Sequence, residues 1–130
     1  MIALIQRVSS AQVTVDGESI ACIGTGLLAL IGVQPGDDVV RAERLVERIL
    51  GYRVFSDANG RMNLSLRDTH GGLLLVPQFT LAADTRKGTR AGFSTAAAPT
   101  LAVRLFDVCV ARARAQHTLV ETGRFGADMS

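Results

Sequence analysis

The sequence has no tryptophan, and aromatic residues make up only 5% of its 130 positions. Proteins that bind single-stranded nucleic acid without sequence preference stack bases on aromatic rings, so this composition does not favour such a surface. No apolar run approaches the roughly 18 residues that a membrane span needs. The first ten residues, MIALIQRVSS, have no basic segment before the apolar ones, unlike a signal peptide. We therefore expect a soluble, cytoplasmic protein with no membrane partner.

An excess of one charge is also lacking, because 14 basic and 12 acidic residues leave a net charge of +2. This balance does not suggest a non-specific polyanion binder, although it is compatible with a local basic patch. The two cysteines, Cys22 and Cys109, lie among apolar residues. We interpret them as two buried thiols rather than as a disulfide.

Several catalytic signatures are absent as well. The two histidines, His70 and His117, are far apart, and no cysteine–histidine cluster has the spacing of a metal site. We expect both histidines at the surface, because isolated histidines more often lie there than act as bases. The sequence has neither a Gly-x-Ser-x-Gly elbow nor a Walker loop. It therefore gives no reason to expect a metal or an organic cofactor.

The apolar periodicity predicts one domain covering residues 1–130. We expect strands at 2–7, 11–15, 18–23, 27–33, 52–55, 62–66, 73–76 and 118–121, and helices at about 38–50 and 99–117. Asp37 or Asp38 is expected to cap the first helix. The first strand has apolar residues on both faces, which predicts that it is covered on both sides. The order of these elements favours a layered α/β domain with two helices against a sheet.

The pattern changes abruptly after Val76, where a buried strand opens into Pro77-Gln78-Phe79-Thr80 and then a loop with Arg86, Lys87 and Arg90. Strand ends in α/β sheets are common ligand sites. An amide and a hydroxyl there suit a polar ligand, and the three cations suit phosphates. The pattern alone still favours the simpler interpretation, a strand followed by an ordinary basic loop.

Six motifs together change that balance, because they occur in the order and at the spacing of one family. They are IQRV at 5–8, GLLALIGV at 26–33, RVFSDANGRMNLSL at 53–66, LLLVPQFTLAAD at 73–84, KGTRAGF at 87–93 and TGRFGADM at 122–129. With them, the chain resembles the D-aminoacyl-tRNA deacylases over essentially its whole length.

The resemblance implies a three-layer β/β/α fold with a mixed, barrel-like sheet. It implies hydrolysis of the ester bond of D-aminoacyl-tRNA, and of glycyl-tRNA mischarged on tRNA-Ala, as chiral proofreading of translation. It further implies a homodimer, a site near the dimer interface for the 3′-terminal aminoacyl-adenosine, no metal or organic cofactor, and RNA rather than DNA as the nucleic acid partner.

The resemblance also assigns roles to individual positions. The family's catalytic motif falls on Gln78, Phe79 and Thr80. The substrate-binding positions fall on Arg7, Pro77, Lys87, Ala102, Phe125, Gly126 and Met129, with Phe125 and Met129 at the end that contacts adenine.

The chemistry of an activated ester suits these residues, because the enzyme needs to supply little beyond positioning, a water molecule and oxyanion donors. Gln78 and the backbone N–H groups around Phe79 and Thr80 are the expected donors. A neutral threonine needs a base to act as a nucleophile, and none lies nearby in the sequence. We therefore expect Thr80 to position substrate or water, with assistance from the ribose 2′-hydroxyl.

The chain departs from the family pattern in two places that bear on the site. Pro77 replaces a serine, which removes a hydroxyl and a backbone donor. The family continues after FGADM with a strand and a Gly-Pro element that reaches into the partner's site and rejects L-amino acids, whereas this sequence stops at Ser130. In the family, the position of Arg7 holds that element. Two alternatives stay open: the sequence is truncated before the element, or the site lacks its usual chiral gate and Arg7 lacks its partner.

Two other functions remain open from the sequence. The first is an RNA-binding or structural homodimer that keeps the fold and has lost catalysis, which Pro77 and the end of the sequence suggest. The second is a nucleotide-binding protein that acts on another small ester.

Overall fold

A four-stranded sheet lies at the centre of the computed structural model, which describes residues 1–78 and 98–123. Its strands stand in the order β1 (Ile2–Val8), β4 (Gly26–Gly32), β7 (Gly72–Pro77) and β8 (Val120–Thr122). β1 is antiparallel to β4, whereas β4, β7 and β8 run parallel to one another. In the part of the chain described, β1 and β8 are the two edges of an open sheet.

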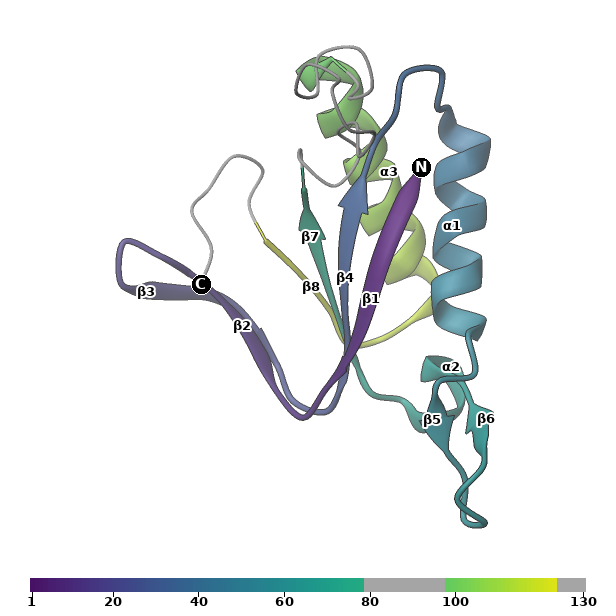
Figure 1. Cartoon of the computed structure of the whole chain (residues 1–130). Helices are drawn as coiled ribbons and strands as arrows, with labels where there is room; N and C mark the ends of the chain where they lie inside the picture. The colour runs from purple at the N-terminus through teal and green to yellow at the C-terminus, as the bar shows by residue number, and fades with distance from the viewer. Residues whose placement is uncertain (79–97, 124–130) are drawn as a thin grey trace, which may run out of the picture.

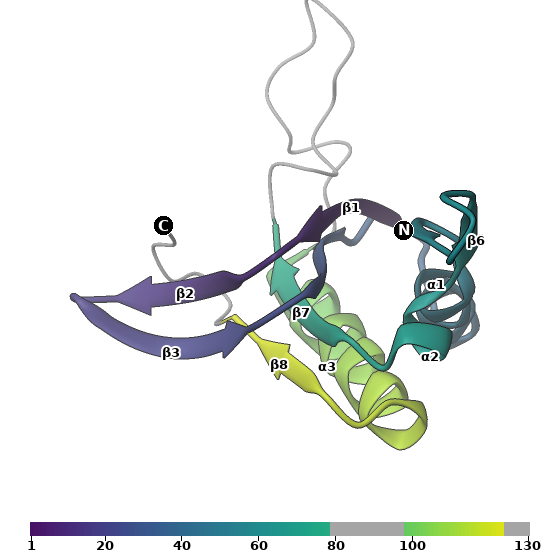
Figure 2. The same cartoon turned by 90° about the horizontal axis from the view of Figure 1, so that it is seen from below.

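Two long helices cover one face of this sheet, and a hairpin lies on the other (Figures 1 and 2). The helices are α1 (Val39–Gly51) and α3 (Pro99–Gln116), and they pack against each other. The hairpin consists of β2 (Ala11–Val15) and β3 (Glu18–Ile23), joined at Asp16-Gly17. This arrangement confirms the predicted α/β class and its three-layer β/β/α order.

Strand β7 is the centre of the core, because all six of its residues are buried. Side chains alternate across a strand, so its leucines and valine divide between the two faces. Leu73 and Leu75 pack in the cluster that contains α1 and α3, whereas Leu74 and Val76 pack in the cluster that contains the hairpin. A single strand therefore joins both apolar layers.

Both long helices begin and end within two residues of their predicted bounds, and a third helix was missed. Residues 52–69 hold the small strands β5 (Phe55–Ser56) and β6 (Met62–Leu64) and the one-turn helix α2 (Leu66–Thr69). Ser65 accepts from the backbone of Asp68, and the Asp68 side chain accepts from the backbone of Ser65. This capping box was readable in the sequence as Ser-x-x-Asp before a helical turn.

Three expectations about burial were wrong. One face of β1 is uncovered, with Ile2 37% and Leu4 54% exposed, because β1 is an edge strand and the hairpin covers the β4 and β7 side of the sheet. Cys22 is exposed, although Cys109 is buried as expected and both thiols are free. Burial raises the pKa of Cys109 to about 12, so this thiol is protonated and inert. The third case is His117, which is buried rather than at the surface.

None of the described helices is long and apolar enough to cross a membrane.

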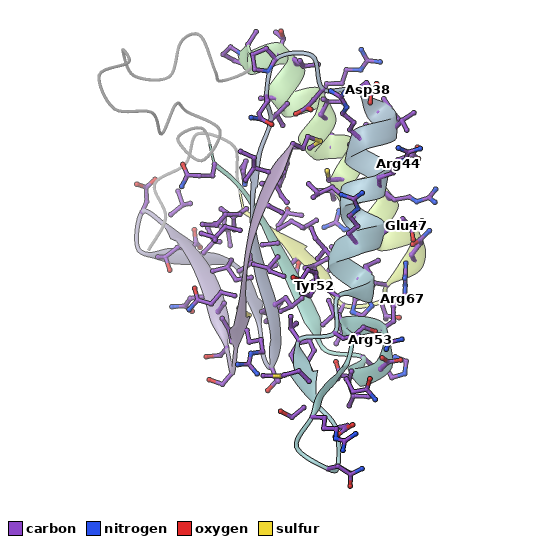
Figure 3. All side chains as sticks on the ribbon, turned by 45° about the vertical axis from the view of Figure 1, so that its right-hand side comes forward. Asp38, Arg44, Glu47, Tyr52, Arg53 and Arg67 are labelled. Atoms are coloured by element: carbon purple, nitrogen blue, oxygen red, sulfur yellow. The ribbon has the colours of Figure 1, made fainter. Side chains whose placement is uncertain are left out.

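One carboxylate, Glu47, ties the three helices together on their outer side. Its Oε1 accepts from the guanidinium of Arg112 in α3 at 2.9 Å, and its Oε2 accepts from Arg67 in α2 at 2.7 Å. Arg67 also donates to Gln116 at 2.9 Å. Figure 3 shows Glu47 on α1 with Arg67 beyond the end of that helix.

Replacing this carboxylate tests the interaction through its pH dependence. The pKa of Glu47 is lowered from 4.5, first by the hydrogen bond from Arg67 and then by that from Arg112. A lowered pKa in the folded state means that the contribution to stability is complete above about pH 4.5 and is lost as pH falls through the folded value. We expect Glu47→Gln to lower the melting temperature at pH 7 and to have little effect at pH 3.

The matched control is Glu43→Gln on the same helix, since Glu43 has a single ion pair among the described residues, with Arg112 at 3.5 Å. Thermal unfolding followed by circular dichroism measures both variants. A Glu47→Gln effect that is the same at both pH values, or no larger than that of Glu43→Gln, would contradict this account.

Candidate active site

The parallel strands β4 and β7 end at the same edge of the sheet. Their register places Ile31 beside Pro77, and the backbone N–H of Gln78 donates to the carbonyl of Ile31 at 2.9 Å. Ligands of open α/β sheets tend to bind outside the carboxyl ends of such strands. We call residues 31–33 and 76–78 the carboxyl edge. It is the part of the described structure where the predicted catalytic strand end lies.

Proline fits at position 77 because a backbone N–H group there would point away from β4. Gly72 and Gln78 donate to carbonyls of the β4 side, and Leu73 donates to Leu119 on the β8 side. Donors alternate along a strand, so residue 77 faces the β8 side, where β8 ends at Thr122. Proline therefore costs no hydrogen bond between β4 and β7. A serine at this position would add a hydroxyl and an N–H donor.

The start of α3 forms a small apolar wall at the same edge. Ala102 is 5% exposed and belongs to one buried cluster with Val33, which follows β4, and with Leu105. The structure thus brings Ala102 to the end of the sheet that holds Pro77 and Gln78. A side chain larger than alanine at this position would have to displace Val33 or Leu105, since buried residues are closely packed.

An ion pair that the sequence analysis missed fixes the loop between β4 and α1. The amino group of Met1 donates to Asp37 Oδ1 at 2.9 Å, and the backbone N–H of Gln34 donates to Asp37 Oδ2 at 2.7 Å. The two partners of the ion pair are 1% and 3% exposed. The helix cap is the neighbouring Asp38, which accepts from the N–H of Arg41. Both aspartates were candidates for the cap, and no sequence pattern separated them.

Arg7 lies at the opposite end of the sheet from these residues. It pairs with Leu27, which is level with Leu73, whereas Pro77 is four positions further along β7. At about 3.3 Å per residue, the separation along the strands is roughly 13 Å. In the described structure the Arg7 guanidinium donates to the sulfur of Met62 at 3.5 Å. One chain therefore does not bring Arg7 to the carboxyl edge.

Both histidines also lie at that opposite end. The ring Nε2 of His117 is 2.6 Å from the carbonyl oxygen of Gly71, just before β7, so this nitrogen carries a proton and donates. His70 ends α2 in a left-handed conformation with φ 58° and is exposed. A cavity of about 390 Å³ lies there, with Cys22, His70 and Thr118 among its lining residues. Neither imidazole is a base for chemistry at the carboxyl edge.

The remaining predicted site residues lie outside the described residues. These are Phe79, Thr80, Lys87, Phe125, Gly126 and Met129. Within residues 1–78 and 98–123, no group of three histidine, cysteine, aspartate or glutamate side chains has the arrangement of a metal site. What the described part of the edge offers is an amide side chain directly after a buried strand and a small apolar wall. An amide N–H donor can bind and polarise a carbonyl.

The chain has relatives over nearly its whole length. The model of the family described as D-Tyr-tRNA(Tyr) deacylase matches residues 4–130. A D-aminoacyl-tRNA deacylase of Thioalkalivibrio sulfidiphilus is 66% identical over 130 residues, which cover 100% of this chain and 87% of the relative. One of Xanthomonas campestris is 62% identical and one of Pseudomonas savastanoi is 57% identical, with 99% of this chain and 89% of each relative covered.

Two solved structures share the fold. A protein described as c-Myc DNA unwinding element binding protein superposes with a TM-score of 0.92 at 35% identity, covering 98% of this chain and 87% of the other. A probable eukaryotic D-amino acid tRNA deacylase superposes with a TM-score of 0.80, covering 98% of this chain and 90% of the other. At 16% identity, the second likeness shows the fold alone.

Proposed function

The chain belongs to the D-Tyr-tRNA(Tyr) deacylase family, and we propose that it hydrolyses the ester bond of D-aminoacyl-tRNA at the carboxyl edge, releasing a D-amino acid and tRNA. The observation that carries this proposal is the register of β4 and β7, which holds Gln78 at the end of a buried strand, at the same edge as Ala102. Glycyl-tRNA formed on tRNA-Ala is a second substrate in this proposal, because glycine has no side chain for the site to exclude.

Catalysis follows from oxyanion stabilisation. When water attacks the ester carbonyl, its oxygen gains negative charge, and fixed N–H donors lower the energy of that state. The backbone N–H of Gln78 is already bonded to Ile31, so the contribution of this residue comes from its carboxamide. The backbone N–H groups of Phe79 and Thr80 are the further donors. Thr80 positions the substrate or the water, and the ribose 2′-hydroxyl assists, because a neutral threonine without a base is a poor nucleophile.

Substrate binding extends beyond the residues that the structure describes. The family motif assigns Lys87 and Gly126 to the substrate, and it assigns Phe125 and Met129 to the terminal adenosine. A lysine binds phosphate as a point charge, and apolar side chains pack on a base. These assignments rest on matching sequence positions.

A homodimer completes this proposal, and two features of the described fold support it. Leu4 pairs with Leu30 on the sheet face that carries the hairpin, yet Leu4 is 54% exposed beside Ile2. A second copy packed on this uncovered face of β1 would bury both side chains. Arg7, at the far end of the sheet from Gln78, would then serve the partner's site, since a two-fold axis brings opposite ends of two chains together.

A second candidate is a nucleic acid-binding homodimer without catalysis. Pro77 favours it, because a hydroxyl and an N–H that the family has at the strand end are missing. The 35% identical structural relative is named for binding DNA. This candidate predicts tRNA binding with no turnover.

The direct test measures deacylation of D-Tyr-tRNA and L-Tyr-tRNA by the purified chain. We expect release of D-tyrosine from D-Tyr-tRNA well above the rate without protein, and the rate on L-Tyr-tRNA measures chiral selection. Faster turnover of the D ester supports chiral proofreading. Equal turnover of both esters would leave ester hydrolysis and contradict chiral selection, and no turnover by folded protein would favour the second candidate.

Substitutions at the strand end separate the roles of Gln78 and Thr80. We expect Gln78→Ala to lower kcat by about 10²–10³ with a smaller change in KM, the size expected when one oxyanion donor is removed. Gln12→Ala is the control, because Gln12 is an exposed glutamine on the hairpin. We expect Thr80→Ala to lower the rate by less than about 10⁴, the scale of a lost nucleophile. A trapped acyl-Thr80 intermediate would show instead that Thr80 is the nucleophile.

A further inference from the structure

Helix α1 carries its charges in rows of one sign. Glu43 and Glu47 are four positions apart, and so are Arg44 and Arg48. Side chains at this spacing lie next to each other on a helix, and like charges there destabilise it. A helix whose charges served only solvation would gain from alternating them. Arg44 and Glu47 are three positions apart, but among the described residues Glu47 pairs with Arg67 and Arg112 and forms no ion pair with Arg44. Each row is therefore stabilised only by opposite charge from outside the helix.

The acidic row has that source within the described fold. Glu47 is paired with Arg67 and Arg112, and Arg112 also lies 3.5 Å from Glu43. Each acidic residue thus has a cation from α2 or α3 beside it.

The basic row has no such source within residues 1–78 and 98–123. Arg44 and Arg48 are exposed and form no ion pair with residues 1–78 or 98–123, and Arg41 is 3.7 Å from Asp37 with 60% of its side chain exposed. Arg44 lies on α1 between Asp38 and Glu47 (Figure 3). Together with Met1 and Leu45, the three arginines line one depression of about 270 Å³. We call Arg41, Arg44 and Arg48 the arginine row.

The arginine row begins beside the carboxyl edge. Asp37, which contacts Arg41, also binds the amine of Met1 at the start of β1. Strand β1 is two positions from β7 in the sheet. Neighbouring strands are about 4.8 Å apart, so the start of β1 is roughly 10 Å from the end of β7. From there the row follows α1 for about 10 Å, because the seven steps from Arg41 to Arg48 rise 1.5 Å each.

We propose that the arginine row binds the phosphate backbone of tRNA next to its aminoacylated end. This inference rests on the proposed function, which brings the end of a tRNA to Gln78. A guanidinium binds phosphate through paired N–H donors, and a helix holds several of them at fixed spacing. Contacts to phosphate position a nucleic acid without reading its sequence. Although the net charge of the chain is only +2, the arginine row therefore forms a local basic surface that can bind a polyanion.

The first experiment measures binding of uncharged tRNA to the full chain over a range of salt concentrations. We expect Arg44→Gln/Arg48→Gln to weaken binding about tenfold near physiological salt and to reduce the slope of log K against log salt by about 1 to 2. The control is Arg61→Gln/Arg114→Gln, which removes two exposed arginines elsewhere, in the turn before β6 and in the last turn of α3. The control should bind like the wild type.

The second experiment compares hydrolysis of D-Tyr-tRNA with that of the D-tyrosyl ester of adenosine, which has no tRNA backbone. The double variant at Arg44 and Arg48 should lose kcat/KM about tenfold on the tRNA and keep its rate on the short ester. If the double variant lost kcat/KM equally on both substrates, or kept the wild-type tRNA affinity and salt slope, the proposed role of the arginine row would be wrong.

The two proposals fail separately. If the double variant keeps its tRNA affinity and the wild type deacylates D-Tyr-tRNA, the proposed role of the arginine row is wrong and the proposed function stands. If the wild type binds tRNA through these arginines but hydrolyses neither ester, the proposed function is wrong and the proposed role of the arginine row stands.

Discussion

The backbone hydrogen bonds between β4 and β7 run in parallel register, from Gly26 beside Gly72 to Ile31 beside Pro77. Because the two strands point the same way, both end at one edge, and the bond from Gln78 to Ile31 holds the first residue after β7 there. A shift by one residue would turn every side chain of β7 to the other face. Leu73 and Leu75 would then leave the helix side of the core, so burial on both faces fixes the register and with it the position of Gln78.

The sequence was sufficient to predict the layers of the fold. It was not sufficient to predict which surfaces stay exposed or which distant residues form ion pairs. Continuous apolar runs identified β4 and β7, and apolar periodicity identified the bounds of α1, since burial dictates residue type strongly. The exposed face of β1 was not predicted, because apolar residues on both sides of a strand do not say which layers reach it. The pair of Met1 with Asp37 joins residues far apart in the chain, and no local pattern encodes such contacts.

At the candidate site, a family resemblance identified the motif around Gln78, and the fold showed where Gln78 lies. Periodicity alone could not distinguish a catalytic strand end from a strand followed by a basic loop. The fold adds that Ala102 lies at the same edge and that Arg7 lies at the other end. Two features have no partner among the described residues, namely the exposed face of β1 and the arginines Arg44 and Arg48 of α1. A second copy suits the apolar feature, and an RNA backbone suits the charged one.

The most direct measurement of where the chemistry lies is a backbone NMR titration with a non-hydrolysable analogue, adenosine carrying D-tyrosine through a 3′-amide. Substrate binding at the carboxyl edge predicts that the amide signals of Val33, Gln78 and Ala102 shift with a single dissociation constant. Shifts confined to the cavity at the opposite end, around Cys22, His70 and Thr118, would contradict the account.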